Sequence, residues 1–542
     1  MKRDVLVVAA AFWGTRGAAR TVVVSFDASR LVQTLDDLYI GVNLDSGSLY
    51  RNLDTDSTVL STLLSNLAPL QLRVGGTASD KLLYVPDGAA GPAGDNVTVL
   101  SDASWASLVG FAARSGADLL FDVNAAGFLD ADNAWSAGGN ASALFAATAA
   151  SGLAVSGWEL GNEPDLWQKH FGVSLSGAQL ADNLRELQRA LADAGLSTRV
   201  TGPSLAKYDA ALMQSFLGRW EETGGGELAW ASHAYPLGPP SYAPESAKPR
   251  CSVEHFLDRI NVEHVTAYLS EIRGDIGRFG DASATRLVLE ETASNSLGGC
   301  VGFSDRFVSG FYWLPLLGIV GEAGWHQVNR QDFVGMSFTS TGSNYALVGP
   351  PGWTSGDDLL VGDDSPNADY FITLLWKRLM GRGVLSSVLV SGDTEQRATA
   401  HVWCTAASAG APPGAVALAF TNGHFEPVAF ALSAGVDTPS WPPRSRIEYV
   451  LTADPAAGGL TGHGALLNGA RMRVEDDGSL FPGWGEGRRV DGPAPLVVPP
   501  LSYGFVVFPD AGAAACGGDA AAHRPMPLVS RAWGVITRFF WQ

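Results

Sequence analysis

The sequence SGWEL at residues 156–160 is followed by GAQLADNLRELQRALADA at residues 177–194 and by TRVTG at residues 198–202. The first and third segments are short and apolar, which is typical of buried strands. The middle segment carries leucines at helical spacing and predicts an amphipathic helix. A strand, a helix and a second strand in this order are the building unit of a parallel sheet.

The same alternation continues on both sides, from about Leu38 to about Arg382. Eight strands that alternate with helices predict a (β/α)8 TIM barrel at residues 38–383, in the α/β class. The predicted strands are Leu38–Asn43, Leu70–Val74, Asp118–Val123, Ser156–Leu160, Thr198–Gly202, Leu228–His233, Arg286–Glu290 and Trp325–Asn329. The predicted helices include Ser57–Asn66, Ser104–Ser115, Gly177–Ala194, Ala210–Glu222, Val253–Arg273, Asp305–Gly321 and Ala368–Gly381.

After Gly383 the pattern changes to short strands separated by Gly, Pro and Asn turns, which predicts a C-terminal β-sandwich at residues 384–516. Thr21–Phe26 is a further strand, and we expect residues 20–37 to join that sandwich. The strands expected within the sandwich include Val384–Val390, Thr399–Cys404, Ala415–Thr421, Arg446–Leu451 and Tyr503–Phe508.

The two ends of the chain differ in character from the barrel and the sandwich. Residues 1–19 have basic residues, an apolar run and small residues, as in a signal peptide cleaved after Ala19, although an apolar first strand is the alternative. Residues 517–542 form a tail that we expect to be disordered or processed, with a docking strand as the alternative. Sequons at Asn96 and Asn140 agree with a secreted protein, or one delivered to a lysosome or vacuole. No later apolar run is long enough for a transmembrane segment.

Charge and cysteine content narrow the function. A formal net charge of -19 argues against a nucleic-acid partner, which demands a basic face, and against tight binding of a highly sulfated polymer. The four cysteines, Cys251, Cys300, Cys404 and Cys516, allow three disulfide pairings. None has the CxxC spacing of a zinc or redox site, so we expect no metal.

Two carboxylates lie where a barrel enzyme places its catalytic groups, at the carboxyl ends of the strands. Glu163 follows the fourth predicted strand, and Glu291 follows the seventh. Hydrolysis of a glycosidic bond needs one carboxyl group as acid/base and a second as nucleophile, about 5–5.5 Å apart in retaining enzymes. Strand alternation predicts that Glu290 faces away from Glu291, and Glu159 lies inside its strand, below the rim. Neither is therefore expected to be catalytic.

The segment Trp158–Pro164, WELGNEP, resembles the acid/base motif of the heparanase and plant β-glucuronidase family, glycoside hydrolase family 79. The likeness extends in order over about 480 residues of the chain, roughly the part from the first barrel strand to the last cysteine. The further matching segments are Leu72–Thr77, Ser232–Tyr235, Glu291–Gly299, Arg330–Gln331, Asn344–Tyr345, Asp369–Tyr370, Val402–Cys404, Leu467–Gly469 and Pro500–Phe505.

The resemblance implies a retaining hydrolase with Glu163 as acid/base and Glu291 as nucleophile, and it needs no cofactor. It also implies that Cys404 pairs with Cys516, which leaves Cys251 and Cys300 as the second pair. The expected substrates are a glucuronic-acid-containing polysaccharide, a proteoglycan or a small glucuronide. Asn162, directly before Glu163, can hydrogen-bond the sugar 2-hydroxyl. The further substrate-binding residues that the resemblance implies are Asp45, Thr77, His233, Tyr235, Gly298, Gly299, Gln331 and Tyr345.

Within that set, Gly298, Gly299 and Tyr345 match positions that hold the uronate carboxylate, the glycines through their N–H groups. Tyr235 would hydrogen-bond the nucleophile. His233 and Gln331 would lie at the rim or behind the substrate, and His233 and Tyr235 are about as easily explained as satisfied core polar groups.

The chain also departs from animal heparanases. Thr77 is followed within 41 residues by the third strand, so the segment excised from those enzymes is missing and we expect a single-chain enzyme. Its basic residues are scattered, which favours removal of terminal glucuronic acid over cleavage inside heparan sulfate. The alternatives are a catalytically weak glycan-binding relative and a retaining barrel glycosidase for neutral sugars.

Overall fold

The computed structural model describes residues 19–51, 53–89, 98–196, 199–241, 250–334, 344–349, 366–434 and 443–517. The predicted signal peptide (except Ala19), the sequon asparagine Asn96 and nearly all of the tail lie outside these residues. Within them, no helix combines the length and apolar character needed to cross a bilayer.

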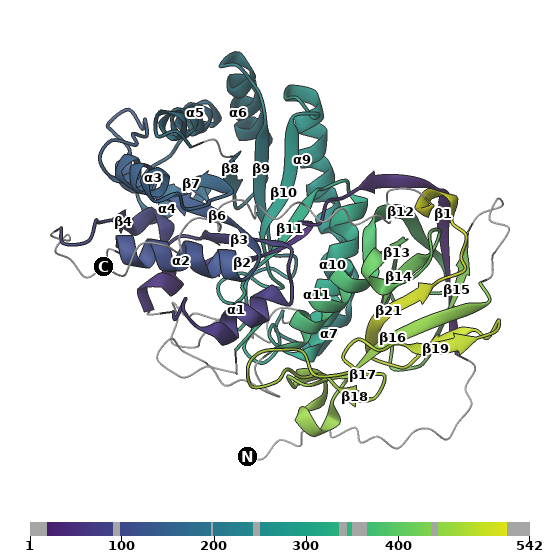
Figure 1. Cartoon of the computed structure of the whole chain (residues 1–542). Helices are drawn as coiled ribbons and strands as arrows, with labels where there is room; N and C mark the ends of the chain where they lie inside the picture. The colour runs from purple at the N-terminus through teal and green to yellow at the C-terminus, as the bar shows by residue number, and fades with distance from the viewer. Residues whose placement is uncertain are drawn as a thin grey trace, which may run out of the picture.

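Eight parallel strands close into a barrel, as predicted, and each overlaps its predicted range (Figure 1). The order around the barrel follows the sequence, and the last strand pairs with the first. All eight strands therefore present their carboxyl ends at one mouth of the barrel. The barrel strands are β2 (Ile40–Asp45), β3 (Leu70–Gly75), β6 (Ala117–Val123), β7 (Gly157–Leu160), β8 (Arg199–Leu205), β9 (Leu228–Ala234), β10 (Thr285–Thr292) and β11 (Gln327–Arg330).

Helices surround the barrel, and one predicted helix proves to be three. The predicted helix Val253–Arg273 is interrupted at Asp258, where the backbone is extended. There the N–H of Arg259 bonds Gln396 O and its guanidinium pairs with Asp393, so contacts to the C-terminal sheet redirect the chain. The helices are α1 (Thr58–Ser65), α2 (Asp102–Arg114), α3 (Asn140–Ser151), α4 (Trp167–His170), α5 (Gly177–Asp193), α6 (Ala210–Glu222), α7 (Val253–Leu257), α8 (Ile260–Glu263), α9 (Val265–Phe279), α10 (Gly310–Glu322) and α11 (Ala368–Leu379).

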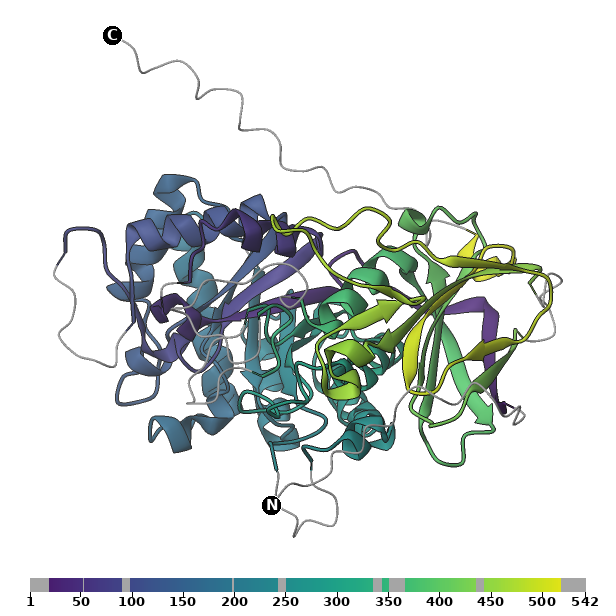
Figure 2. The ribbon, with the colours of Figure 1, turned by 90° about the horizontal axis from the view of Figure 1, so that it is seen from below.

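The C-terminal part forms a sheet of eleven strands among the described residues, which folds over its own apolar core, as the predicted β-sandwich requires (Figure 2). The first strand of the chain, β1, lies in this sheet between β12 and β15. The strands are β1 (Arg20–Thr34), β12 (Met380–Ser391), β13 (Ala398–Thr405), β14 (Val416–Asn422), β15 (Val428–Ser433), β16 (Ser445–Ala453), β17 (Ala465–Leu467), β18 (Ala470–Arg471), β19 (Arg488–Asp491), β20 (Leu496–Val498) and β21 (Ser502–Phe508). A separate pair, β4 (Leu82–Tyr84) and β5 (Thr98–Leu100), follows β3.

Helix α10 joins the barrel to the sheet. Its sequence GFYWLPLLGIVGE is apolar around most of its circumference, and nearly every side chain is buried. A Cβ on Gly310, Gly318 or Gly321 would lie 2.1–2.5 Å from a ring of the sheet. The glycines therefore let the helix backbone approach Tyr503, His401 and Trp403, which fixes the sandwich against the barrel.

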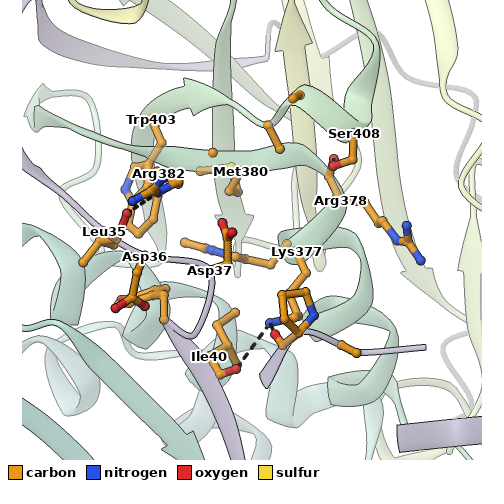
Figure 3. Close-up of a pocket in the computed structure, with 17 residues that line it drawn as sticks. Leu35, Asp36, Asp37, Ile40, Lys377, Arg378, Met380, Arg382, Trp403 and Ser408 are labelled. Atoms are coloured by element: carbon orange, nitrogen blue, oxygen red, sulfur yellow. Dashed lines mark hydrogen bonds between the residues drawn. The ribbon is translucent and has the colours of Figure 1, made fainter. Parts of the chain in front are cut away.

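A cavity of about 310 Å³ lies where the barrel meets the sheet (Figure 3). Its lining includes Ile40 and Pro69, which mark the amino ends of β2 and β3. Catalytic groups of such barrels lie at the opposite, carboxyl ends. The Lys377 ammonium at this cavity donates to the carbonyls of Ile40 and Pro69. We therefore assign the cavity to the domain junction and not to substrate binding.

Both disulfides that the sequence led us to expect are formed, Cys404–Cys516 and Cys251–Cys300. They span 112 and 49 residues, respectively.

Replacing Cys404 and Cys516 together by Ala should lower the free energy of unfolding by about 2–4 kcal/mol, because the cross-link restricts the unfolded chain. Replacing the other pair should cost about 0.7 kcal/mol less from loop length alone. Urea unfolding of both double variants tests this, and an unchanged midpoint for the first would contradict it.

Candidate active site

Glu163 lies just after β7, in a tight turn that begins the 3-10 helix Pro164–Leu166. Its backbone is left-handed, with φ 51° and ψ 54°. A non-glycine residue in this region is strained, and such strain concentrates at functional sites. Its N–H donates to the carbonyl of Ser204, near the end of β8, at 3.0 Å. Its side chain is 18% exposed and reaches the barrel mouth.

Glu291 lies inside β10 and not after it, and a β-bulge directly precedes it in that strand. Along β9, Leu289 pairs with Ser232 and Glu291 pairs with His233, so Glu290 is an extra residue. The bulge turns both glutamates toward the barrel interior, and both lie near Arg73. The expectation that Glu290 faces away from Glu291 is therefore wrong, because it assumed an unbroken alternation.

Arg73 on β3 is the buried centre of the site and was not assigned a role from the sequence. It makes two 2.8 Å bonds to Glu159 and one of 2.8 Å to Glu291 Oε2. Its Nε lies 3.7 Å from Glu290. Glu159 is fully buried below the rim, as its position within the strand predicts. An arginine inside the apolar run LQLRVG, within a segment that resembles the family, was the available signal.

The environment of Glu291 favours its ionised form. Burial opposes ionisation, but the charges of His233 and Arg73 and the hydrogen bond from Tyr235 hold the pKa of Glu291 below its usual value. The Tyr235 hydroxyl donates to Oε1, and Arg73 donates to Oε2. Both oxygens are thus fixed in direction, which is what a carboxylate nucleophile requires.

Glu163 and Glu291 face each other across the mouth. One carboxylate oxygen of each and a ring nitrogen of His233 lie within 4.8 Å of one another. His233 Nδ1 is 3.0 Å from Glu163 Oε1 and 4.0 Å from Glu291 Oε2. His233 is therefore a direct partner of the predicted acid/base, more than a rim residue.

Asn162 is oriented by its neighbours. Its Oδ1 accepts from Arg73 at 2.8 Å, and its backbone N–H donates to Asp80 at 3.1 Å. The Trp167 indole donates to its carbonyl at 2.8 Å. Because Oδ1 is held by a guanidinium, the amide Nδ2 is the group left to donate to a sugar hydroxyl.

Asp45, Tyr345 and Gln331 gather on the nucleophile side of the mouth. Burial, and to a smaller extent the charge of Glu291, raises the pKa of Asp45 to about 7. Burial raises the pKa of Tyr345 well above its usual value, and the charges of Asp332, Glu291 and Asp45 add to the shift. Gln331 follows β11 with its Oε1 buried and unpartnered. Thr77 is exposed, next to Gly76, which lies against the Asp45 carboxylate.

The glycine pair packs against the segment that carries Tyr345. Gly298 O accepts from Asn344 N at 2.8 Å, and both glycines have φ above 80°. A Cβ on Gly299 would lie 2.9 Å from Ser304. The Gly299 N–H donates to Ser296 O at 3.2 Å and closes the turn. In this conformation the Gly299 N–H is engaged within the turn, and binding of a carboxylate by the glycine pair stays a prediction.

The carboxylates at the mouth also bear on metal binding. Among the described residues, Glu163, His233 and Glu291 are the group whose donor atoms are close enough to hold a metal ion. Glu163 Oε1 already bonds His233 Nδ1, and the two Glu291 oxygens accept from Tyr235 and from the Arg73 guanidinium. A cation beside that guanidinium is disfavoured.

At the sequon, Asn140 exchanges two hydrogen bonds with the Tyr84 backbone, at 2.8 and 3.2 Å. Glycosylation there stays a prediction.

Comparison with known proteins identifies the family of the chain. The profile of "Glycosyl hydrolase family 79, N-terminal domain" matches residues 39–318, just over half of the chain. The chain belongs to glycosyl hydrolase family 79. It is 26% identical to heparanase of Mus musculus, over 93% of this chain and 96% of that protein. It is also 26% identical to baicalin-beta-D-glucuronidase of Scutellaria baicalensis, over 90% of this chain and 92% of that protein.

Solved structures share the fold. A 4-O-alpha-L-rhamnosyl-beta-D-glucuronidase from Fusarium oxysporum has a TM-score of 0.60 at 14% identity, covering 89% of this chain and 100% of that one. A GH51 arabinofuranosidase from Xanthomonas axonopodis pv. citri has a TM-score of 0.59 at 14% identity, covering 90% of this chain and 99% of that one. Since these enzymes act on different sugars, this likeness supports the fold and leaves the substrate to be argued from the site.

Proposed function

We propose that this family 79 member is a retaining β-glucuronidase, with Glu163 as acid/base and Glu291 as nucleophile. The observation that carries the proposal is the pair of carboxylates, whose nearest oxygens lie within 4.8 Å of each other. Retaining enzymes place the two groups about 5–5.5 Å apart, whereas inverting enzymes leave about 6.5–9.5 Å for a water. The spacing supports a double displacement.

The environments support the two roles. Glu291 is ionised and held by Arg73 and Tyr235, so it attacks the anomeric carbon as the glycosidic bond breaks. Glu163 is partly exposed at the mouth, where it gives its proton to the leaving oxygen. In the second step Glu163 takes a proton from water, which attacks the anomeric carbon and releases Glu291. Asn162 Nδ2 is placed to bond the 2-hydroxyl.

The proposed substrate carries a β-linked glucuronic acid at its end, on a polysaccharide, a proteoglycan or a small aglycone. Heparanase and baicalin-beta-D-glucuronidase, the relatives compared above, support this class. We place the uronate carboxylate beside the Gly298 N–H and the Tyr345 hydroxyl, which are neutral donors. The net charge of -19 disfavours long sulfated chains, so removal of a terminal sugar by the single chain fits better than internal cleavage.

We propose that the protein enters the secretory pathway. The two disulfides support an oxidising compartment, and the predicted signal peptide agrees with it.

The test of substrate charge is the Tyr345→Phe variant. A hydrogen bond to a charged group is worth about 1.5–3 kcal/mol, so wild type should prefer an aryl β-glucuronide over the matching β-glucoside by about 100-fold in kcat/KM. Tyr345→Phe should reduce glucuronide hydrolysis by about 10- to 100-fold and leave the glucoside nearly unchanged. Both substrates are measured with both proteins.

Tyr370→Phe is the matched control. The Tyr370 hydroxyl donates to Leu63 O at the outside of the barrel, so its loss should leave the ratio of the two rates unchanged. Equal kcat/KM for glucuronide and glucoside in wild type would sink the glucuronidase proposal and favour a neutral-sugar glycosidase.

A further inference from the structure

Glu290 is a buried carboxylate one residue before the proposed nucleophile, and the double displacement does not use it. It is fully buried, and the bulge in β10 directs it inward. Its Oε2 accepts a 2.9 Å hydrogen bond from the Ser204 hydroxyl. The same hydroxyl lies 3.0 Å from His233 Nε2, and His233 Nε2 is 3.8 Å from Glu290.

The hydrogen-bond directions in this network follow from proton counting. An ionised Glu290 can only accept, so Ser204 must give it its single hydroxyl proton. The Ser204 oxygen can then only accept from His233, which places a proton on Nε2. When Glu163 is ionised it also can only accept, so Nδ1 carries a second proton. His233 is then an imidazolium.

The backbone supports this arrangement. Ser204 has φ 57°, a strained conformation for a residue with a side chain. Its carbonyl accepts the N–H of Glu163, while its hydroxyl joins Glu290 to His233. Ser204 therefore both holds the turn that carries Glu163 and links Glu290 to His233.

The charged and titratable groups around His233 come from several elements. They are Glu163 and Asp165 after β7, Glu290 and Glu291 on β10, Arg73 on β3, Tyr235 directly after β9, and Tyr268 on α9, whose hydroxyl donates to His233 O. Burial lowers the pKa of His233, but the glutamates outweigh it and raise the pKa to about 10. Burial likewise opposes ionisation of Glu290, but Arg73 and His233 keep the pKa of Glu290 below its usual value.

We propose that Glu290 is a positioning residue: with Ser204 it keeps His233 as an imidazolium that donates Nδ1–H to Glu163 Oε1. This inference rests on the proposed role of Glu163. Donation to Oε1 leaves Oε2 to carry the catalytic proton toward the glycosidic oxygen. Once that proton has been given to the leaving group, the imidazolium stabilises the new carboxylate.

The test is a pH titration of His233 by nitrogen-15 NMR in the histidine-labelled, substrate-free enzyme, with His233→Gln used to assign the signal. In wild type the ring should stay doubly protonated to about pH 9 or higher. In Glu290→Gln the titration should move down by at least about one pH unit, because an anion beside the ring is lost. Glu290→Asp, which keeps the charge, should restore most of the shift.

Kinetics supply the second readout. Glu290→Gln should lower kcat/KM for aryl glucuronides with poor leaving groups about tenfold more than for activated ones, because the former depend on proton donation. Ser204→Ala removes the bridge but keeps both charges, and should give smaller changes in the same direction. If Glu290→Gln does not fold, Ser204→Ala is the variant that tests the proposal.

An unchanged His233 titration in Glu290→Gln, or an equal shift in Glu290→Asp, would overturn the proposal. The titration needs no substrate. A shifted titration in a protein that does not hydrolyse glucuronides would therefore overturn the proposed function and leave the role of Glu290 in charging His233 standing.

Discussion

Glu291→Gln should reduce kcat on aryl β-glucuronides by a factor on the order of 10⁴ or more, since the covalent intermediate cannot form. The amide is nearly isosteric with the carboxylate. It can still accept from Arg73 or Tyr235, and Arg73 keeps its two bonds to Glu159. The fold should survive, with a thermal midpoint within a few degrees of wild type.

Glu290→Gln is the matched control for this loss, because it changes the adjacent glutamate of the same strand. It should lose only about tenfold, as a residue that acts through His233. If Glu290→Gln instead abolished turnover while Glu291→Gln kept it, the register of β10 would be misassigned and Glu290 would be the nucleophile.

Glu163→Ala should affect substrates according to their leaving groups. Without a proton donor, glucuronides with poor leaving groups should slow by about 10²–10⁴-fold, while activated aryl glucuronides keep more of their first-step rate. Added azide should restore part of the turnover of activated substrates. It attacks the glycosyl-enzyme without needing a general base, and the truncated side chain leaves space at the partly exposed mouth.

The azide product separates this role from a general loss of structure. A β-glucuronyl azide should accumulate with Glu163→Ala and not with wild type. Equal losses for good and poor leaving groups, with no azide product, would show that Glu163 is not the acid/base.

Much of the fold follows from local pattern. The eight barrel strands were predictable because each is a short apolar run between turns, and α5 because its leucines share one face. The alanine-rich α3, NASALFAATAAS, has no such contrast between faces, and the sequence pattern did not give its bounds. Strands β17 to β20 are two to four residues long, too short for a pattern. The break at Asp258 depends on a partner over 130 residues away in sequence.

The site residues likewise fall into those that the sequence predicts and those that only the fold brings together. The positions of Glu163 and Glu291 followed from strand ends and from resemblance to the family. The bulge at Glu290 did not, because period-two alternation gives no signal for an inserted residue. The central position of Arg73 in the site could not be predicted, because its three carboxylate neighbours come from β7 and β10. Only closure of the barrel brings them together.

The most direct test of the central claim is to trap the covalent intermediate on the wild-type protein. A 2-deoxy-2-fluoro-β-glucuronyl fluoride forms the glycosyl-enzyme and slows its hydrolysis, because fluorine destabilises the oxocarbenium-like transition state. Peptide mass spectrometry with fragmentation should place one fluoroglucuronyl group on Glu291. Label on Glu290 or another residue, or an enzyme that hydrolyses aryl β-glucuronides yet is neither labelled nor inactivated, would contradict the account.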